Sequence, residues 1–265
     1  MRSSEEVCRG NYTYFSVTRD IPLILIVETA TLGGSVCLSQ GSRTLSTRAG
    51  DSKVSHSNRL LQEISECLEE ASVSLNDVEL FAAASGPGSF TGLRIGIATV
   101  KALAATSGRP CVGIPTLRAI ARGAGPSSET VALLPAGRGE MFAQLLSVSP
   151  EGVVTDVDTA AHLAPVQVIE RYAYLSTVRW AGPGAQIHRE FLRDAAQKKA
   201  IKFREGVTDI NEESEAGWIV TPEITNLGEQ VAALAFEQWK REEVVTPNHL
   251  SAVYVRPSDA ELKCQ

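Results

Sequence analysis

Short apolar runs alternate with longer amphipathic stretches along the first half of the chain. Residues 23–27 read LILIV and residues 81–84 read FAAA, and both runs have the length of buried strands. Residues 35–39 and 43–47 alternate apolar and polar positions, which predicts two further strands, the first in a hairpin with 23–27. With the helices between them, the order is strand, strand, strand, helix, strand, helix, strand, helix. This order indicates an α/β fold.

Residues 55–71 predict an amphipathic helix with a clear division between its two faces. Glutamates and a glutamine occupy one face, while apolar residues recur at helical spacing on the other. The apolar positions are Leu60, Leu61, Ile64, Cys67, Leu68 and Ala71.

Residues 91–108 predict a long helix that is apolar on two sides, with Thr91 as its N-cap and Gly108 as its stop. One stripe holds Leu93, Gly96, Ile97, Val100 and Ala104, and the other holds Ile95, Ala98, Ala102 and Ala105. A helix that is apolar on two sides is covered on two sides. We therefore expect one side to lie on the sheet of its own domain, and the other on a second helix, domain or chain.

The sequence predicts three parts. Residues 1–20 carry polar and charged residues without an apolar core, so we interpret them as a flexible N-terminal extension and not as a signal peptide. A Gly-, Pro- and Ser-rich stretch at 123–129 separates a first domain, 21–124, from a smaller second domain, 125–265. The amphipathic helix near 225–243 is expected to pack back on the first domain.

Composition and charge exclude several classes of protein. The chain has 265 residues, 43% hydrophobic and 21% charged, with a net charge of −6, which argues against a chain that binds nucleic acid by itself. The five cysteines and four histidines are scattered without metal-ligand spacing, so we expect reduced thiols and no metal site. No apolar run reaches the length of a membrane span, and we expect a cytoplasmic protein.

Two turns carry the candidate chemistry. Backbone N–H groups at a glycine-rich turn beside the start of a helix can bind a phosphate. The candidate phosphate contacts in these two turns are Thr29, Thr31, Gly86, Gly88 and Ser89. Their spacing fits neither of the two common nucleotide-binding motifs, so a structural turn is favoured. Glu28 follows a buried strand but has no paired carboxylate or histidine, and we interpret it as hydrogen-bonded to loop backbone. No catalytic residue is assigned.

Five motifs occur in one order: ETAT at 28–31, HSNRLL at 56–61, SGPGSFTGLRIG at 85–96, GIPTL at 113–117 and GRGEMF at 137–142. Together they resemble the TsaB (YeaZ) family, the dimerisation subunit of the bacterial tRNA threonylcarbamoyladenosine machinery. The resemblance implies an actin-like fold of two RNase-H-like lobes, with mixed sheets flanked by helices. It also implies a non-catalytic scaffold that binds and activates the catalytic subunit TsaD.

The same resemblance bears on metal chemistry. TsaD-like chains hold a metal with a histidine pair, and in this sequence Thr116 and Ile120 stand at those positions. Neither side chain holds a metal in that way. The resemblance therefore implies the fold of TsaD without its metal-dependent chemistry. It also implies no cofactor on the isolated chain, with ATP or an adenylate bound only weakly or within the complex.

In this family the two helices described above form the partner surface. The implied interface residues are His56, Leu60, Leu61, Ile64, Leu68, Leu93, Arg94, Ile97, Val100 and Lys101. The ATPase TsaE is a further expected partner, tRNA is contacted only through the complex, and a homodimer is expected when the chain is alone.

Two other functions remain open on the sequence. One is an actin-fold, ATP-dependent phosphotransferase or peptidase-like enzyme that uses the Gly-Pro-Gly turn at 86–88. It would need an acidic metal-binding set, which the sequence does not offer. The other is a homodimer with a separate role, because an apolar helical patch without a partner often pairs with itself.

Overall fold

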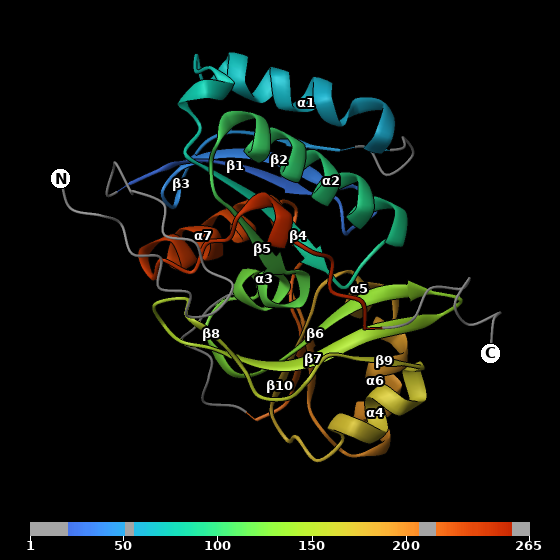
Figure 1. Ribbon diagram of the computed structural model, residues 1–265. Helices are drawn as coiled ribbons and strands as arrows, with labels where there is room; N and C mark the ends of the chain where they lie inside the picture. Colours follow the sequence, from blue (N-terminus) through green and yellow to red (C-terminus); the bar gives the residue numbers. More distant parts are fainter. Residues whose placement is uncertain (1–20, 51–55, 207–215, 256–265) are drawn as a thin grey trace.

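The computed structural model describes residues 21–50, 56–206 and 216–255, with the side chains of 56–58 outside the description. The extension predicted for 1–20 also lies outside it. Two sheets and three layers of helices alternate through the molecule (Figure 1). The predicted α/β class, with mixed sheets flanked by helices, is confirmed.

The first sheet has five strands in the order β3-β2-β1-β4-β5. They are β1 (Leu23–Glu28), β2 (Ser35–Gln40), β3 (Arg43–Ala49), β4 (Leu80–Gly86) and β5 (Cys111–Pro115). β1, β2 and β3 form an antiparallel meander, while β4 and β5 run parallel to β1. The sheet is therefore mixed: β1, β4 and β5 form its parallel half.

The second sheet repeats this plan in the order β11-β12-β10-β6-β7-β8, with β9 also paired to β7. β6, β7 and β8 are antiparallel, and β10 and β12 run parallel to β6. The strands are β6 (Ser127–Gly137), β7 (Glu140–Val148), β8 (Val154–Asp156), β9 (Ala161–Leu163), β10 (Val178–Ala181), β11 (Phe203–Glu205) and β12 (Trp218–Val220). The shared strand order indicates two lobes of one architecture.

The helices form an outer layer on each sheet and one layer between the sheets (Figure 1). α1 (His56–Glu70) and α2 (Phe90–Ser107) cover the outer face of the first sheet. α3 (Thr116–Gly123) and α7 (Leu227–Lys240) lie between the sheets. α4 (Pro165–Tyr172), α5 (Pro183–Ile187) and α6 (Arg189–Lys198) cover the outer face of the second sheet, and the 3₁₀ turns are η1 (Leu75–Asp77) and η3 (Pro247–His249).

β1 is apolar throughout because both of its faces are covered. Ile24 and Ile26 point into the core shared with α3 and α7, whereas Leu25 and Val27 point into the core under α1 and α2. All four side chains are fully buried. The run LILIV thus reflects a sheet packed between two layers of helices. No helix of the described residues is long and apolar enough to cross a membrane.

α2 lies unusually close to the end of β1. A Cβ atom at Gly96 would come within 2.1 Å of the Thr29 Oγ1 atom, and this hydroxyl donates a 2.8 Å hydrogen bond to the carbonyl of Gly92. The predicted N-cap at Thr91 is wrong by two positions, because the Ser89 hydroxyl accepts the 3.2 Å bond from the Gly92 N–H. The predicted stop at Gly108 is confirmed by its left-handed φ of 62°.

Substitution Gly96→Ala tests this close approach. Alanine raises helix propensity by about 1 kcal/mol, but the added methyl group overlaps the Thr29 hydroxyl. We expect a net loss of about 1–3 kcal/mol in the free energy of unfolding, measured by urea denaturation.

Gly123→Ala in α3 is the matched control, because its nearest neighbour is the flexible end of the Ile224 side chain at 2.9 Å. That side chain is free to yield, so we expect a smaller effect of either sign. Equal losses for the two variants would contradict the role given to Gly96.

Candidate functional site

The first candidate site is the pair of helices on the outer face of the first sheet. α1 and α2 lie side by side over this face (Figure 1). Five of the ten predicted interface residues turn inward and are buried in the core of the chain itself: Leu60, Ile64, Leu93, Ile97 and Val100. In the single chain these five side chains hold the two helices on the sheet. Their predicted contact with a second chain stays a prediction.

The structure shows which of the two apolar stripes of α2 faces the sheet. The stripe with Gly96 faces the sheet because only a residue without a Cβ atom allows the approach to Thr29. Ile97, next to it, keeps 7% of its surface exposed. The periodicity of the sequence identifies two apolar stripes but does not rank them.

The outward surface of the helix pair is narrower than predicted. Leu61 of α1 is 68% exposed, and Leu68 is half-buried. On α2 one stripe of exposed positions holds Arg94, Ala98, Ala102 and Ala105. We call Leu61 and these four residues the outer stripe. The sequence predicted these alanines only as a second apolar side of the helix. Their stripe contains no glycine, and this absence is the signal that would have identified it as the outward side. The side chain of His56 lies outside the described part of the structure.

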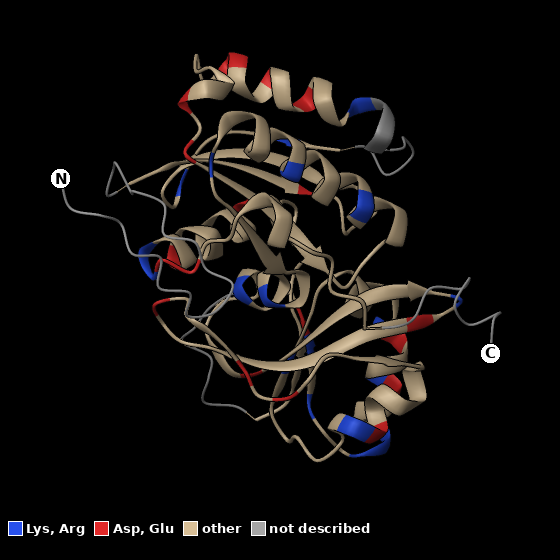
Figure 2. Ribbon diagram, in the orientation of Figure 1, with Lys and Arg blue, Asp and Glu red and all other residues tan. Residues whose placement is uncertain are grey.

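Charge differs between the two helices. Acidic residues follow α1, whereas α2 carries basic residues (Figure 2) and has no Asp or Glu in its sequence. The carboxylates of α1 have partners in the chain: Arg48 pairs with Glu66 at 3.5 Å and with Glu70, and Arg59 lies 3.7 Å from Glu63. Such exposed pairs contribute little to stability, but Glu63, Glu66 and Glu70 each have an arginine of the chain beside them.

The C-terminal segment 245–255, called the strap below, covers one flank of α2. The Lys101 ammonium donates to the carbonyls of Leu250 at 3.1 Å and Asn248 at 3.5 Å. The charged group of Lys101 thus holds the chain's own strap, and its predicted contact with a partner stays a prediction.

The glycine-rich turn after β4 is filled by backbone from elsewhere in the chain. A Cβ atom at Gly86, whose φ is +114°, would lie 2.5 Å from the Val253 carbonyl oxygen of the strap. A Cβ atom at Gly88 would lie 2.5 Å from the carbonyl oxygen of Ala30, to which the Ser89 N–H donates at 2.8 Å. These glycines serve close backbone packing, as the structural interpretation of the turn predicted.

The turn after β1 also has its polar groups engaged internally. The Thr29 hydroxyl is buried against α2, as described above. The Thr31 N–H and hydroxyl donate to the Glu28 carboxylate at 2.8 and 2.7 Å. The interpretation of Glu28 as a strand-end acid bonded to loop backbone is thereby confirmed.

The second candidate site is a cavity of about 670 Å³ between the two lobes. Its lining is mostly apolar, with Leu32 and Ile187 on opposite lobes, and of the five candidate phosphate contacts only Thr31 and Ser89 reach it. Its charged lining residues are Glu28 and Glu223, and the described residues that line it include no Lys or Arg. These two carboxylates make the described lining acidic, which disfavours a phosphate-bearing ligand.

Other reactive groups are held in unreactive settings. Burial raises the pKa of the Cys37 and Cys111 thiols to about 12, and it also raises the pKa of Cys67. Protonated thiols are poor nucleophiles and poor metal ligands. In the part of the chain that the structure describes, no three His, Cys, Asp or Glu side chains lie close enough to hold a metal ion. Thr116 and Ile120 are both fully buried.

Comparisons with known proteins place the chain in a family. The family model described as "TsaD: tRNA N6-adenosine threonylcarbamoyltransferase" matches residues 51–252. The tRNA threonylcarbamoyladenosine biosynthesis protein TsaB of Escherichia coli K12 is 33% identical over 156 residues, which are 58% of this chain and 67% of that protein. A tRNA N6-adenosine threonylcarbamoyltransferase of Rhizobium johnstonii is 48% identical over 59 residues, 22% of this chain and 16% of that protein.

The solved structure of YeaZ from Pseudomonas aeruginosa superimposes with a TM-score of 0.68 at 24% identity, and covers 88% of this chain and 99% of that one. This likeness supports the actin-like fold of two lobes that the sequence motifs predicted. The chain therefore belongs to the family that the TsaD model describes and, within it, to the TsaB (YeaZ) group.

Proposed function

We propose that this chain is a non-catalytic subunit of tRNA N6-threonylcarbamoyladenosine synthesis. It binds a TsaD-type catalytic homologue through the outer stripe and holds that homologue in its active arrangement. The name of the E. coli relative, a tRNA threonylcarbamoyladenosine biosynthesis protein, supports the pathway. The support for a docking role is the outer stripe itself.

The outer stripe has the properties of a helix-docking surface. Its alanines are small enough to let a second helix approach closely, and Leu61 supplies apolar area beside them. Among the described residues, the strap contacts α2 at Lys101 and at Phe90, and it leaves the alanines of the outer stripe exposed. An exposed apolar stripe at the edge of a helix pair is favourable to bury against another pair.

The internal chemistry supports a non-catalytic role. The buried thiols are protonated, several polar groups of both turns are bonded within the chain, and the described lining of the cleft presents carboxylates where a nucleotide would need cations. The chemistry of the pathway would then reside in the TsaD-type partner. This assignment also fits an isolated chain without a cofactor of its own.

The other partners follow from the same proposal. TsaE would join the assembled pair, and tRNA would be contacted through the complex, because this chain has a net charge of −6. The chain would act in the cytoplasm. When the TsaD-type partner is absent, the outer stripe would pair with a second copy of the chain.

Leu61→Asp tests the docking surface without damage to the core. Leu61 is 68% exposed in the single chain, so the free energy of unfolding should change by less than about 0.5 kcal/mol. In the complex the new carboxylate would be buried without a partner, and the Kd for the purified TsaD homologue of the same genome should rise about 100-fold. Titration calorimetry measures this constant.

Val166→Asp in α4 is the matched control, because Val166 is also an exposed apolar residue, on the second lobe. Its Kd should equal that of the unchanged chain. A Leu61→Asp variant that binds as tightly as the control would refute the docking surface. Absence of micromolar binding by the unchanged chain would refute the proposed function as a whole.

The second candidate function is an ATP-dependent enzyme, and the cavity between the lobes is the observation in its favour. The lining carboxylates make binding of a triphosphate unfavourable. We expect titration of the isolated chain with Mg-ATP to give a Kd weaker than about 1 mM, at the low end of measured affinities. Micromolar binding accompanied by ATP turnover would support the enzyme instead.

A further inference from the structure

The strap ends at an exposed cluster of aromatic and cationic side chains. It pairs with β5 through two hydrogen bonds between Val245 and Cys111, at 2.8 and 2.9 Å, and buries Leu250 under α2. The Val253 N–H then donates to the Ser85 carbonyl at 2.7 Å. These bonds fix the path of the backbone up to the first turn of α2.

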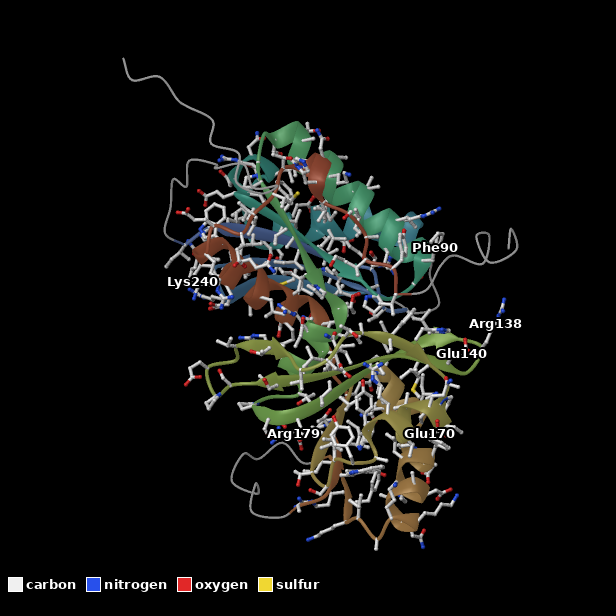
Figure 3. The ribbon with its side chains drawn as sticks, turned by 60° about the horizontal axis from the view of Figure 1, so that its bottom comes forward. Phe90, Arg138, Glu140, Glu170, Arg179 and Lys240 are labelled. Atoms are coloured by element: carbon white, nitrogen blue, oxygen red, sulfur yellow. The ribbon has the colours of Figure 1, made fainter. Side chains whose placement is uncertain are left out.

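Three side chains stack at this point. The rings of Tyr254 and Phe90 have centroids 5.2 Å apart, and the Arg94 guanidinium lies 3.9 Å from the centroid of Phe90. Phe90 is 36% exposed and Tyr254 is 46% exposed. Figure 3 shows Phe90 at the free end of α2, on the side of the molecule where the β6–β7 hairpin carries Arg138 and Glu140. We call Phe90, Arg94 and Tyr254 the anchor cluster.

The anchor cluster continues the outer stripe. Phe90, Arg94, Ala98 and Ala102 follow at intervals of four residues on α2, so the cluster lies at the N-terminal end of the same exposed face. Tyrosine and arginine are enriched among the residues that contribute most to protein interfaces. Stacking already holds the Arg94 side chain in place, which reduces the entropy lost when a partner binds it.

The charge of Arg94 indicates what the partner brings. No carboxylate of the described residues pairs with Arg94 in the chain, and α2 has no acidic residue. A second copy of this chain is a poor source of one, because the glutamates of α1 are engaged by Arg48, Arg59 and Ser65. The charge therefore favours a different chain with a carboxylate opposite Arg94.

We propose that the anchor cluster receives an Asp or Glu side chain of the TsaD-type homologue, so that the docking surface extends from α1 and α2 onto the C-terminal strap. This inference rests on the proposed function. The carboxylate would accept hydrogen bonds from the Arg94 guanidinium while its methylene groups cover the Tyr254 ring. Neither family motif of the helices includes Tyr254, which reaches the surface only through the fold of the strap.

The test measures binding of the purified TsaD homologue of the same genome to the full-length chain. Arg94→Ala should raise the Kd 10- to 100-fold, and Tyr254→Ala about tenfold. Because the two side chains act as one stack, the double variant should lose less than the product of the two losses. All three variants should keep the melting temperature of the unchanged chain, since the side chains are exposed.

Salt dependence separates a charge contact from a structural effect. The Kd of the unchanged chain should rise with NaCl concentration more steeply than that of Arg94→Ala, because the variant lacks the interfacial cation. Arg94→Lys should keep the salt dependence and recover part of the affinity. Arg189→Ala, an exposed arginine of α6 on the second lobe, is the control and should match the unchanged chain in both respects.

The outcomes distinguish this inference from the proposed function. If Leu61→Asp abolishes binding while Arg94→Ala and Tyr254→Ala bind as the unchanged chain does, the anchor cluster is refuted and the docking surface stands. If Arg94→Ala weakens only the self-association of the chain, measured by sedimentation, a second copy is the occupant and the inference is overturned. If the unchanged chain does not bind the homologue, both are refuted.

Discussion

The close packing of α2 against the end of β1 determines the surface chemistry of the first lobe. The Thr29 hydroxyl bonds to the Gly92 carbonyl, and a side chain at Gly96 would overlap that hydroxyl. The helix is therefore fixed in rotation as well as in position. Its large apolar residues fill the core, and Ala98, Ala102, Ala105 and Arg94 are turned outward. A docking surface arises here from a constraint inside the chain.

The same packing engages several polar groups of the turn before α2. A glycine-rich turn at a helix start offers N–H groups to a phosphate. Here the Ser89 hydroxyl caps the helix, the Ser89 N–H bonds to Ala30, and the Val253 carbonyl lies against Gly86. Groups that would otherwise face a ligand face the chain itself. Backbone packing and phosphate binding compete for the same space, and in this chain packing occupies it.

The sequence predicted the regular elements of the first lobe well because their hydrophobic patterns are strong. The run LILIV, the helix of 55–71 and the stop at Gly108 all correspond to observed features. The sequence did not predict which stripe of α2 faces inward. Periodicity gives the angle between the two stripes but does not show which of them lies against the sheet. The sequence also missed the short strands β8, β9, β11 and β12, and the path of the strap, which depends on long-range contacts with Ser85 and Lys101.

The two lobes have one strand order but different relations to the docking surface. α7 follows the second sheet in the sequence, yet it packs on the first sheet, opposite α1 and α2. After α7 the chain pairs with the start of β5 at Val245, passes along α2 and places Tyr254 against Phe90. The C-terminal part of the chain thus contacts both faces of the first sheet. The strap is held on β5, on α2 and on the turn after β4, so the anchor cluster is supported by three elements of the first lobe.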